Sequence, residues 1–142
     1  MESALLEIVL DSSILIAAER RRMRPEQAIE TVQKTVGEVP IVLCSLTIAE
    51  IGLGIYRADT PETRNRRRKF LDELKATVPV YPVTEATAEI VARIGGDQAA
   101  KGHNLPLGDL IIGACALELG YAVGTSNLRD FSRIPGLNIV RL

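Results

Sequence analysis

The sequence predicts an α/β fold in which helices flank both faces of a mostly parallel, five-stranded sheet. Short apolar runs rich in β-branched residues alternate with longer segments that carry helix start and stop signals. The apolar runs contain few polar residues, which is typical of strands buried on both faces in a three-layer structure. A chain of 142 residues is long enough for one domain with its own core. We therefore expect residues 1–142 to form a single domain.

Five apolar runs are the expected strands. In chain order they cover residues 5–10, 40–44, 78–83, 121–124 and 138–141. Each run is long enough for a strand and too short for a helix, and turn-forming or charged residues bound it.

Helix signals fill the intervals between these runs. Four helix starts combine a proline or threonine with an acidic or apolar first turn: Pro25-Glu26, Thr60-Pro61-Glu62, Thr84-Glu85 and Pro106-Leu107. Gly120 is placed to end the last of these helices. Further helices are expected over residues 12–22 and 46–57. Two helices in a row then separate the first strand from the second and the second from the third, so helices should outnumber strands.

The termini and the apolar stretches argue against export and against a membrane segment. Glu2 and Glu7 occupy positions where a signal peptide needs positive charge and an unbroken apolar run. The longest uncharged apolar stretch, residues 110–117, is far shorter than the ~20 residues that cross a bilayer. We therefore expect a cytoplasmic protein.

Charge and aromatic content exclude two classes of nucleic-acid-binding protein. Lys and Arg number 17 against 18 Asp and Glu, so a uniformly basic coating protein is excluded, although a local basic patch is not. With 4% aromatic residues and no Trp, a base-stacking platform is a poor fit. Cys44 and Cys115 stand alone in apolar runs, which predicts two buried small hydrophobic residues.

Four acidic residues from distant parts of the chain map to one end of the expected sheet. Asp11 directly follows the first strand, and Glu50 lies one turn into the helix after the second. Asp109 lies in the first turn of the helix that Pro106 opens, and Asp130 follows the fourth strand after a short turn. In open α/β sheets the functional site lies beyond the carboxyl ends of the strands. These four acids are therefore the candidate site.

Each acid also has a simpler structural explanation. Asp11 can cap the helix that follows it, and Glu50 can form a capping box with Thr47. Asp109 can complement a helix dipole, and Asp130 can be an ordinary loop residue. No single acid indicates a site, whereas the convergence of all four does.

The chemistry of such a cluster points to a hard metal ion. Several nearby carboxylates repel one another, and Mg²⁺ or Mn²⁺ prefers oxygen ligands of this kind. Thr125 and Asn127 add neutral oxygens that either orient the acids or belong to a simple turn. His103 lies in an expected loop, and no phosphate-binding glycine motif occurs. Metal-assisted hydrolysis of a phosphodiester is the reaction that best suits this set.

Four segments together resemble the PIN-domain ribonucleases, and in particular the VapC-like toxins of toxin–antitoxin pairs. They cover residues 8–16, 45–55, 107–116 and 124–137, and so extend over nearly the whole chain. The last segment is the most specific, because it contains Thr125, Asn127, Asp130-Phe131 and Pro135-Gly136-Leu137 in order.

This resemblance implies a PIN-like fold and a metal-dependent endoribonuclease that commonly acts on tRNA or rRNA. Asp11, Glu50, Asp109 and Asp130 carry over as catalytic and metal-binding acids, with Mg²⁺ or Mn²⁺ as the cofactor. Ser12 stands where many relatives have Thr, and Thr125 carries over as a polar site residue. Some relatives place the fourth acid at the position of Asn127, so either Asn127 or Asp130 can be the more important. The family also implies a homodimer and a separate cognate antitoxin protein.

A basic run between residues 57 and 75 has two interpretations. Arg64, Arg67 and Arg68 can contact the RNA backbone beside the acids, or they can form an ordinary solvated helix face. The alternative to the toxin function is a non-catalytic PIN-like module that binds RNA or protein. The presence of all four acids argues against that alternative.

Overall fold

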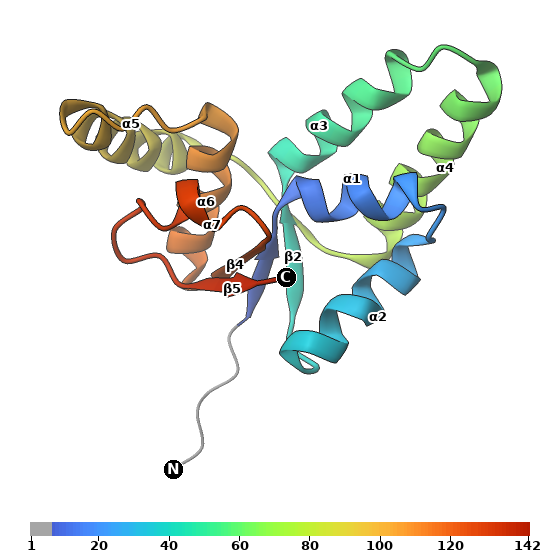
Figure 1. Ribbon diagram of the computed structural model, residues 1–142, viewed down its shortest axis with the longest axis horizontal. Coiled ribbons are helices and arrows are strands. Elements are labelled where there is room, and N and C mark those ends of the chain that lie inside the picture. Colours follow the sequence, from blue (N-terminus) through green and yellow to red (C-terminus); the bar gives the residue numbers. More distant parts are fainter. Residues whose placement is uncertain (1–6) are drawn as a thin grey trace.

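The computed structural model describes residues 7–142, which form a five-stranded parallel sheet flanked by helices (Figure 1). The strands are β1 (Ile8–Leu10), β2 (Ile41–Cys44), β3 (Val80–Tyr81), β4 (Ala122–Thr125) and β5 (Ile139–Arg141). Their order across the sheet is β3-β2-β1-β4-β5, and every pairing is parallel. This arrangement confirms the predicted fold class.

Helices in pairs connect the first four strands, as the sequence predicted. The helices within the described residues are α1 (Ser12–Arg20), α2 (Pro25–Val36), α3 (Ser45–Tyr56), α4 (Pro61–Thr77), α5 (Glu85–Ala100), α6 (Leu107–Leu119) and α7 (Leu128–Phe131). Figure 1 shows α1 to α4 on one side of the sheet and α5 to α7 on the other. Helices α3 and α4 pack against each other as a hairpin that projects beyond the sheet. None of these helices, within residues 7–142, combines the length and apolar character that a membrane span requires.

Some boundaries differ from the prediction for local reasons. Strand β3 spans only Val80–Tyr81 because Pro79 and Pro82 flank it, and proline cannot donate to a strand ladder. Helix α1 ends at Arg20, two residues early, because the chain turns at Arg22, whose φ is 62°. The first strand was predicted to begin at residue 5, but residues 5 and 6 lie outside the described part of the chain. Glu2, one of the two residues that argued against a signal peptide, also lies outside it.

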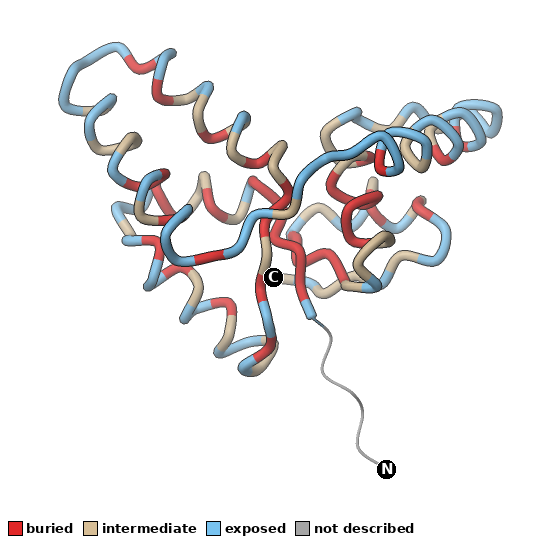
Figure 2. The backbone as a smooth tube through the Cα atoms, turned by 180° about the vertical axis from the view of Figure 1, so that it is seen from behind, coloured by how far each residue is buried: buried red, intermediate tan, exposed pale blue. Residues whose placement is uncertain are grey.

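The core consists of two apolar clusters, one on each face of the sheet. Alternate strand residues supply them, so that Ile8 and Leu10 face α1 to α4 while Val9 faces α5 to α7. Figure 2 shows buried positions concentrated along the strands and on the inner faces of the helices. Cys44 and Cys115 belong to the second cluster as buried free thiols, as predicted. Both sheet faces are therefore covered, which completes the expected three layers.

Close packing of β1 against β4 places the ends of these strands side by side. Gly124 lies directly across from Leu10, and a Cβ atom there would be only 2.9 Å from Cγ2 of Ile8. The Asp11 amide donates to the Gly124 carbonyl at 2.9 Å. This pairing puts Asp11 next to Thr125, so the first polar residue after β1 meets the last residue of β4.

Candidate active site

Asp11 is the most deeply buried acid of the candidate site. It lies at the carboxyl end of β1 and retains only 6% exposure. Its Oδ2 atom accepts hydrogen bonds from Thr125 Oγ1 and Ser13 Oγ, both at 2.8 Å. Asp11 occupies the position before α1, yet its side chain makes no cap hydrogen bond to the helix. Its carboxylate is therefore held by hydroxyl groups and serves no local capping role.

Glu50 reaches the same place from α3. Ser12 Oγ donates to Glu50 Oε1 at 2.6 Å and lies 3.1 Å from Thr47 Oγ1. Helix α3 begins at Ser45, so Thr47 is already inside the helix and the capping box considered from the sequence does not form. A Cβ atom on Gly108 would lie 3.7 Å from Glu50 Oε2, which places this carboxylate against the first turn of α6.

Asn127 joins the remaining two acids. Its Nδ2 atom donates to Asp109 Oδ2 at 3.2 Å and to Asp130 Oδ2 at 3.3 Å. Its own backbone amide donates to Thr125 Oγ1 at 2.9 Å, which ties the turn to the end of β4. The structure thus brings both Asn127 and Asp130 to the site, in different roles: one is an acid and the other is the amide that orients it.

The four acids influence one another electrostatically. Burial, followed in order of effect by the negative charges of Asp11, Asp130 and Glu50, raises the pKa of Asp109 to about 6. Within residues 7–142, no Lys or Arg forms an ion pair with Asp11, Glu50 or Asp109. Asp130 has a neighbouring cation in Arg129 at 3.6 Å, but that side chain is 81% exposed. The cluster therefore carries negative charge that the chain itself leaves largely uncompensated.

The donor set fits a hard divalent cation in its chemistry. Carboxylate, hydroxyl and amide oxygens are the ligands that Mg²⁺ and Mn²⁺ prefer. In residues 7–142, however, no three Asp, Glu, His or Cys side chains already stand close enough together to hold an ion. The two findings are compatible, because charges act on a pKa over longer distances than ligation allows. Ligation of one ion by three of these acids would therefore require movement of their side chains.

The three arginines considered for RNA contact all donate to atoms of the α3–α4 hairpin itself. They do so as follows: Arg64 Nη2 to Ala58 O at 3.4 Å, Arg67 Nη1 to Gly54 O at 2.6 Å, and Arg68 Nη2 to Tyr56 Oη at 2.6 Å. These bonds show how the side chains stabilise the hairpin. Contact of the same residues with RNA stays a prediction.

Sequence reasoning missed one buried charged group next to this site. Glu19 is 7% exposed. Its carboxylate accepts a hydrogen bond from Arg66 Nε at 3.0 Å and forms a second ion pair with Arg67 Nε at 3.9 Å. Its position four residues after the buried Leu15 is the signal that places it on the inner face of α1. Its arginine partners lie 47 and 48 positions away, so the pairing itself had no local signal.

A groove along α1 and α3 leads to Glu50. It has a volume of about 390 Å³, and its lining runs from Glu50 past Leu53 to Arg57 and Arg67. Leu53 and Tyr56 are large apolar residues that remain 50% and 72% exposed on α3. The outer face of α3 therefore combines apolar surface with positive charge beside the acidic cluster.

Comparison with known sequences gives a consistent result. The PIN domain family profile matches residues 8–137. Ribonuclease VapC1 of Rickettsia felis is 29% identical over 133 residues, which make up 94% of each chain. Ribonuclease VapC5 of Mycobacterium tuberculosis is 30% identical over 135 residues, covering 94% of this chain and 92% of its own.

Solved structures show the same fold. A chain in the crystal structure of VapBC2 from Rickettsia felis, bound to promoter DNA, superimposes with a TM-score of 0.81 at 18% identity. That alignment covers 96% of this chain and 99% of the other. A chain of VapBC-5 from Mycobacterium tuberculosis superimposes with a TM-score of 0.73 at 25% identity, with the same coverage. The profile match and these relatives confirm the resemblance read from the motifs, and the chain belongs to the PIN domain family.

Proposed function

We propose that this protein is a metal-dependent endoribonuclease that hydrolyses RNA phosphodiesters, and that it is the toxin of a type II toxin–antitoxin pair. The observation that carries the proposal is the set of four acids at the carboxyl ends of β1 and β4, three of which have no cationic partner within residues 7–142. The names of the relatives, which are VapC ribonucleases, support the same reaction.

Each residue of the cluster has a defined part in this proposal. Asp11, Glu50, Asp109 and Asp130 would hold Mg²⁺ or Mn²⁺. A bound divalent cation supplies Lewis acidity for attack by water on phosphorus and neutralises charge on the leaving oxygen.

The neighbouring polar groups keep the acids in place. Ser12 and Thr125 fix one oxygen each of Glu50 and Asp11 and leave the other oxygen of each carboxylate for ligation. Asn127 spans Asp109 and Asp130, and so keeps these two acids on the same side of the site.

The partner proposals rest on the groove and on the known complexes. Several structures that share this fold are of VapBC, and VapBC-5 is a member of a family of toxin-antitoxin systems. We infer that a cognate antitoxin covers the apolar face of α3 around Leu53 and Tyr56, and that its contact with the groove closes access to Glu50. The remaining parts of the proposal are a homodimer and a tRNA or rRNA substrate.

One observation favours the non-catalytic alternative, namely the lack of a preformed group of three ligands within residues 7–142. Incubation of the purified chain with total cellular RNA in Mg²⁺, in Mn²⁺ and in EDTA separates the two functions. Asp109→Asn is run beside the wild type, and Asp97→Asn, which changes an exposed acid on α5, is the matched control.

Discrete RNA fragments that require metal, persist in Asp97→Asn and disappear in Asp109→Asn would establish the nuclease. A folded wild type that binds RNA without cutting it would overturn the catalytic proposal in favour of the binding module. Cleavage that survives in Asp109→Asn would place the active site elsewhere.

A further inference from the structure

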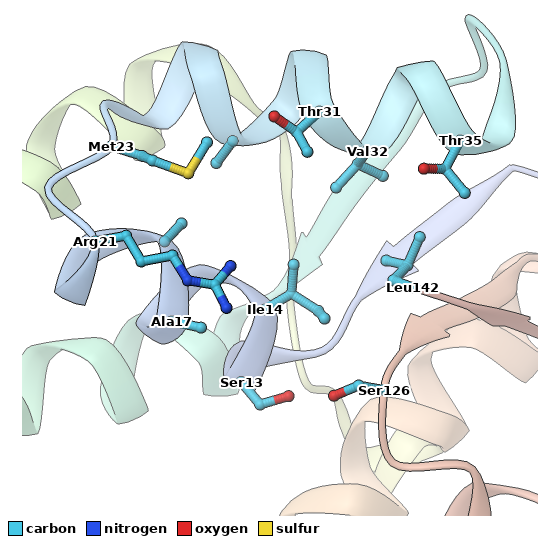
Figure 3. A pocket seen from close by; sticks show the side chains of 12 residues that line it. Ser13, Ile14, Ala17, Arg21, Met23, Thr31, Val32, Thr35, Ser126 and Leu142 are labelled. Atoms are coloured by element: carbon cyan, nitrogen blue, oxygen red, sulfur yellow. The ribbon is translucent and has the colours of Figure 1, made fainter.

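A second cavity opens on the other side of the acidic cluster, between α1 and α2. It has a volume of about 280 Å³ (Figure 3). Its lining comes from four parts of the chain, and includes Ser13, Ile14, Ala17 and Arg21 of the α1 region, Val32 of α2, Ser126 after β4, and Leu142 after β5. This volume is close to the lower limit of small-molecule sites, which is about 300 Å³. The cavity can therefore hold one compact chemical group but is too small for a helix of a partner protein.

The cavity is continuous with the candidate active site through two serines. Ser13 Oγ donates to Asp11 Oδ2 at 2.8 Å, so this hydroxyl belongs to both places. Ser126 lies in the chain between Thr125, which binds Asp11, and Asn127, which binds Asp109. Figure 3 shows Ser13 and Ser126 facing each other at one side of the cavity. Whatever occupies the cavity can therefore contact a hydroxyl group that is itself hydrogen-bonded to Asp11.

The lining of the cavity combines apolar surface with one cation. Ile14, Ala17 and Val32 offer apolar contacts, whereas Arg21 is an exposed residue whose guanidinium faces the cavity. Among residues 7–142 no carboxylate lies within ion-pair distance of Arg21. A guanidinium that the fold leaves available is suited to a phosphate group. An apolar surface beside it suits the face of a base, and hydroxyls suit its edge or a ribose hydroxyl.

We propose that this cavity binds one nucleotide of the RNA, adjacent to the phosphodiester that is cut. The base lies against Ile14, Ala17 and Val32, and its phosphate contacts Arg21. This inference rests on the proposed ribonuclease function for its substrate class. The charge favours a nucleotide over an apolar side chain of a partner protein, because a side chain of that kind would leave Arg21 without a role.

The test measures binding and cleavage separately. The binding probe is a fluorescein-labelled, single-stranded RNA of twelve random nucleotides, used with Asp109→Asn protein so that no cutting interferes. In that background, Arg21→Ala removes the cation, and Ala17→Leu fills the cavity with another good helix former. Arg93→Ala is the matched control, because Arg93 is an exposed arginine of α5 that lines neither this cavity nor the α1–α3 groove.

We expect Arg21→Ala to weaken RNA binding about tenfold. It should also make the dependence of the RNA association constant on salt less steep, reducing the slope in a plot of log K against log[salt] by about 0.7, which is the value for one phosphate contact to a single strand. Ala17→Leu should weaken binding without a change in that slope, because it removes space and no charge. Arg93→Ala should keep the parent's affinity. In proteins with Asp109 intact, sequencing of the RNA ends should show that both cavity variants relax the base preference at one position next to the cut.

Two results would overturn the inference. One is RNA affinity equal to that of the parent in both Arg21→Ala and Ala17→Leu, with thermal unfolding showing that each is folded. The other is loss of binding to the antitoxin protein while RNA binding is unchanged, which would assign the cavity to a protein side chain. If the wild type binds RNA but does not cut it, the catalytic proposal fails, whereas the two variants still decide whether the cavity takes a nucleotide. If no RNA binds at all, both proposals fail.

Discussion

Two buried carboxylates at opposite ends of α1 are stabilised in opposite ways. Asp11 precedes the helix and Glu19 lies in its last turn, and their exposures are nearly the same at 6% and 7%. Glu19 is neutralised by Arg66 and Arg67 of α4. Within residues 7–142, the Asp11 carboxylate instead accepts hydrogen bonds from the hydroxyls of Ser13 and Thr125 and has no cationic partner. Burial of a charge is costly unless it is paired. The paired acid acts as a link between helices, and the acid without a cation marks the place where an external cation would be stabilised.

The same difference extends to the surroundings of each acid. Two arginines of α4 are satisfied by other groups of the fold, because Arg67 donates to Gly54 O of α3 and Arg66 donates to Glu19 of α1. Around Asp109, burial and the negative charges of the neighbouring acids together raise the pKa of that residue to about 6. The charges of the first region are paired within the fold, whereas those of the second would be compensated by the cation that we propose.

The largest expected effect is on catalysis. Asp11→Asn should lower the rate of metal-dependent RNA cleavage by about 100-fold or more, because it removes a negative charge from the proposed metal site. Glu19→Gln should keep the rate within about threefold when both are assayed well below their unfolding temperatures. Single-turnover cleavage of one defined RNA fragment measures both. A comparable loss of cleavage rate in Glu19→Gln would contradict this contrast, because it would show that the paired acid also takes part in the reaction.

The second effect is stabilisation by metal. Mg²⁺ or Mn²⁺ at 100 times its dissociation constant should raise the free energy of unfolding by about 2.7 kcal/mol, because it binds only the folded cluster. Thermal unfolding with increasing metal concentration measures this gain. Asp11→Asn should lose most of it, and Glu19→Gln should retain it. A gain that is identical in Asp11→Asn would remove Asp11 from the metal site.

The third effect is on stability without metal. Glu19→Gln should lower the free energy of unfolding by about 2 kcal/mol, because it leaves Arg66 and Arg67 half-buried without their charged partner. Urea denaturation in EDTA measures it. Glu73→Gln, which breaks the exposed pair with Lys69 at 3.8 Å, is the matched control and should change stability by at most about 0.5 kcal/mol. Equal effects of the two substitutions on the free energy of unfolding would mean that the buried ion pairs of Glu19 stabilise the fold no more than a surface pair does.

The smallest effect is a dependence on pH that runs in the direction opposite to that of a paired acid. The pKa of Asp109 is raised to about 6 in the fold, above its ordinary value in an unfolded chain of about 3.9. Between pH 4 and 6 the folded chain therefore holds more protons at this position, so this residue's contribution to stability falls as the pH rises through that window. Asp109→Asn should remove this contribution.

The same substitution should also raise the Tm at pH 7.5 in EDTA by about 2–4 °C, because it relieves repulsion with Asp11, Asp130 and Glu50. Unfolding curves of both proteins from pH 4 to 8 measure the difference. A wild type whose Tm relative to Asp109→Asn stays constant across that range would contradict the raised pKa. Saturating Mg²⁺ should reverse the order of the two proteins at pH 7.5.

Much of the site was predictable because its signals are local. Each acid stands within a few residues of a strand end or a helix start, and parallel strands carry such positions to one edge of the sheet. The proline and threonine signals likewise placed α2, α4, α5 and α6 near their observed starts. Where proline acts from both sides, as around Val80–Tyr81, the strand became shorter than its apolar run suggested.

By itself, then, the sequence determined the α/β class, the alternation of helices and strands, and the four acids at one end of the sheet. Only the tertiary structure decided which groups surround those acids. Ser12 reaches Glu50 across 38 positions, and Arg66 reaches Glu19 across 47. These pairings depend on how helices pack onto the sheet, and periodicity in the sequence cannot specify them. The cavity between α1 and α2 has the same origin, because its walls meet only when Ser126 is carried by β4 to the side of α1.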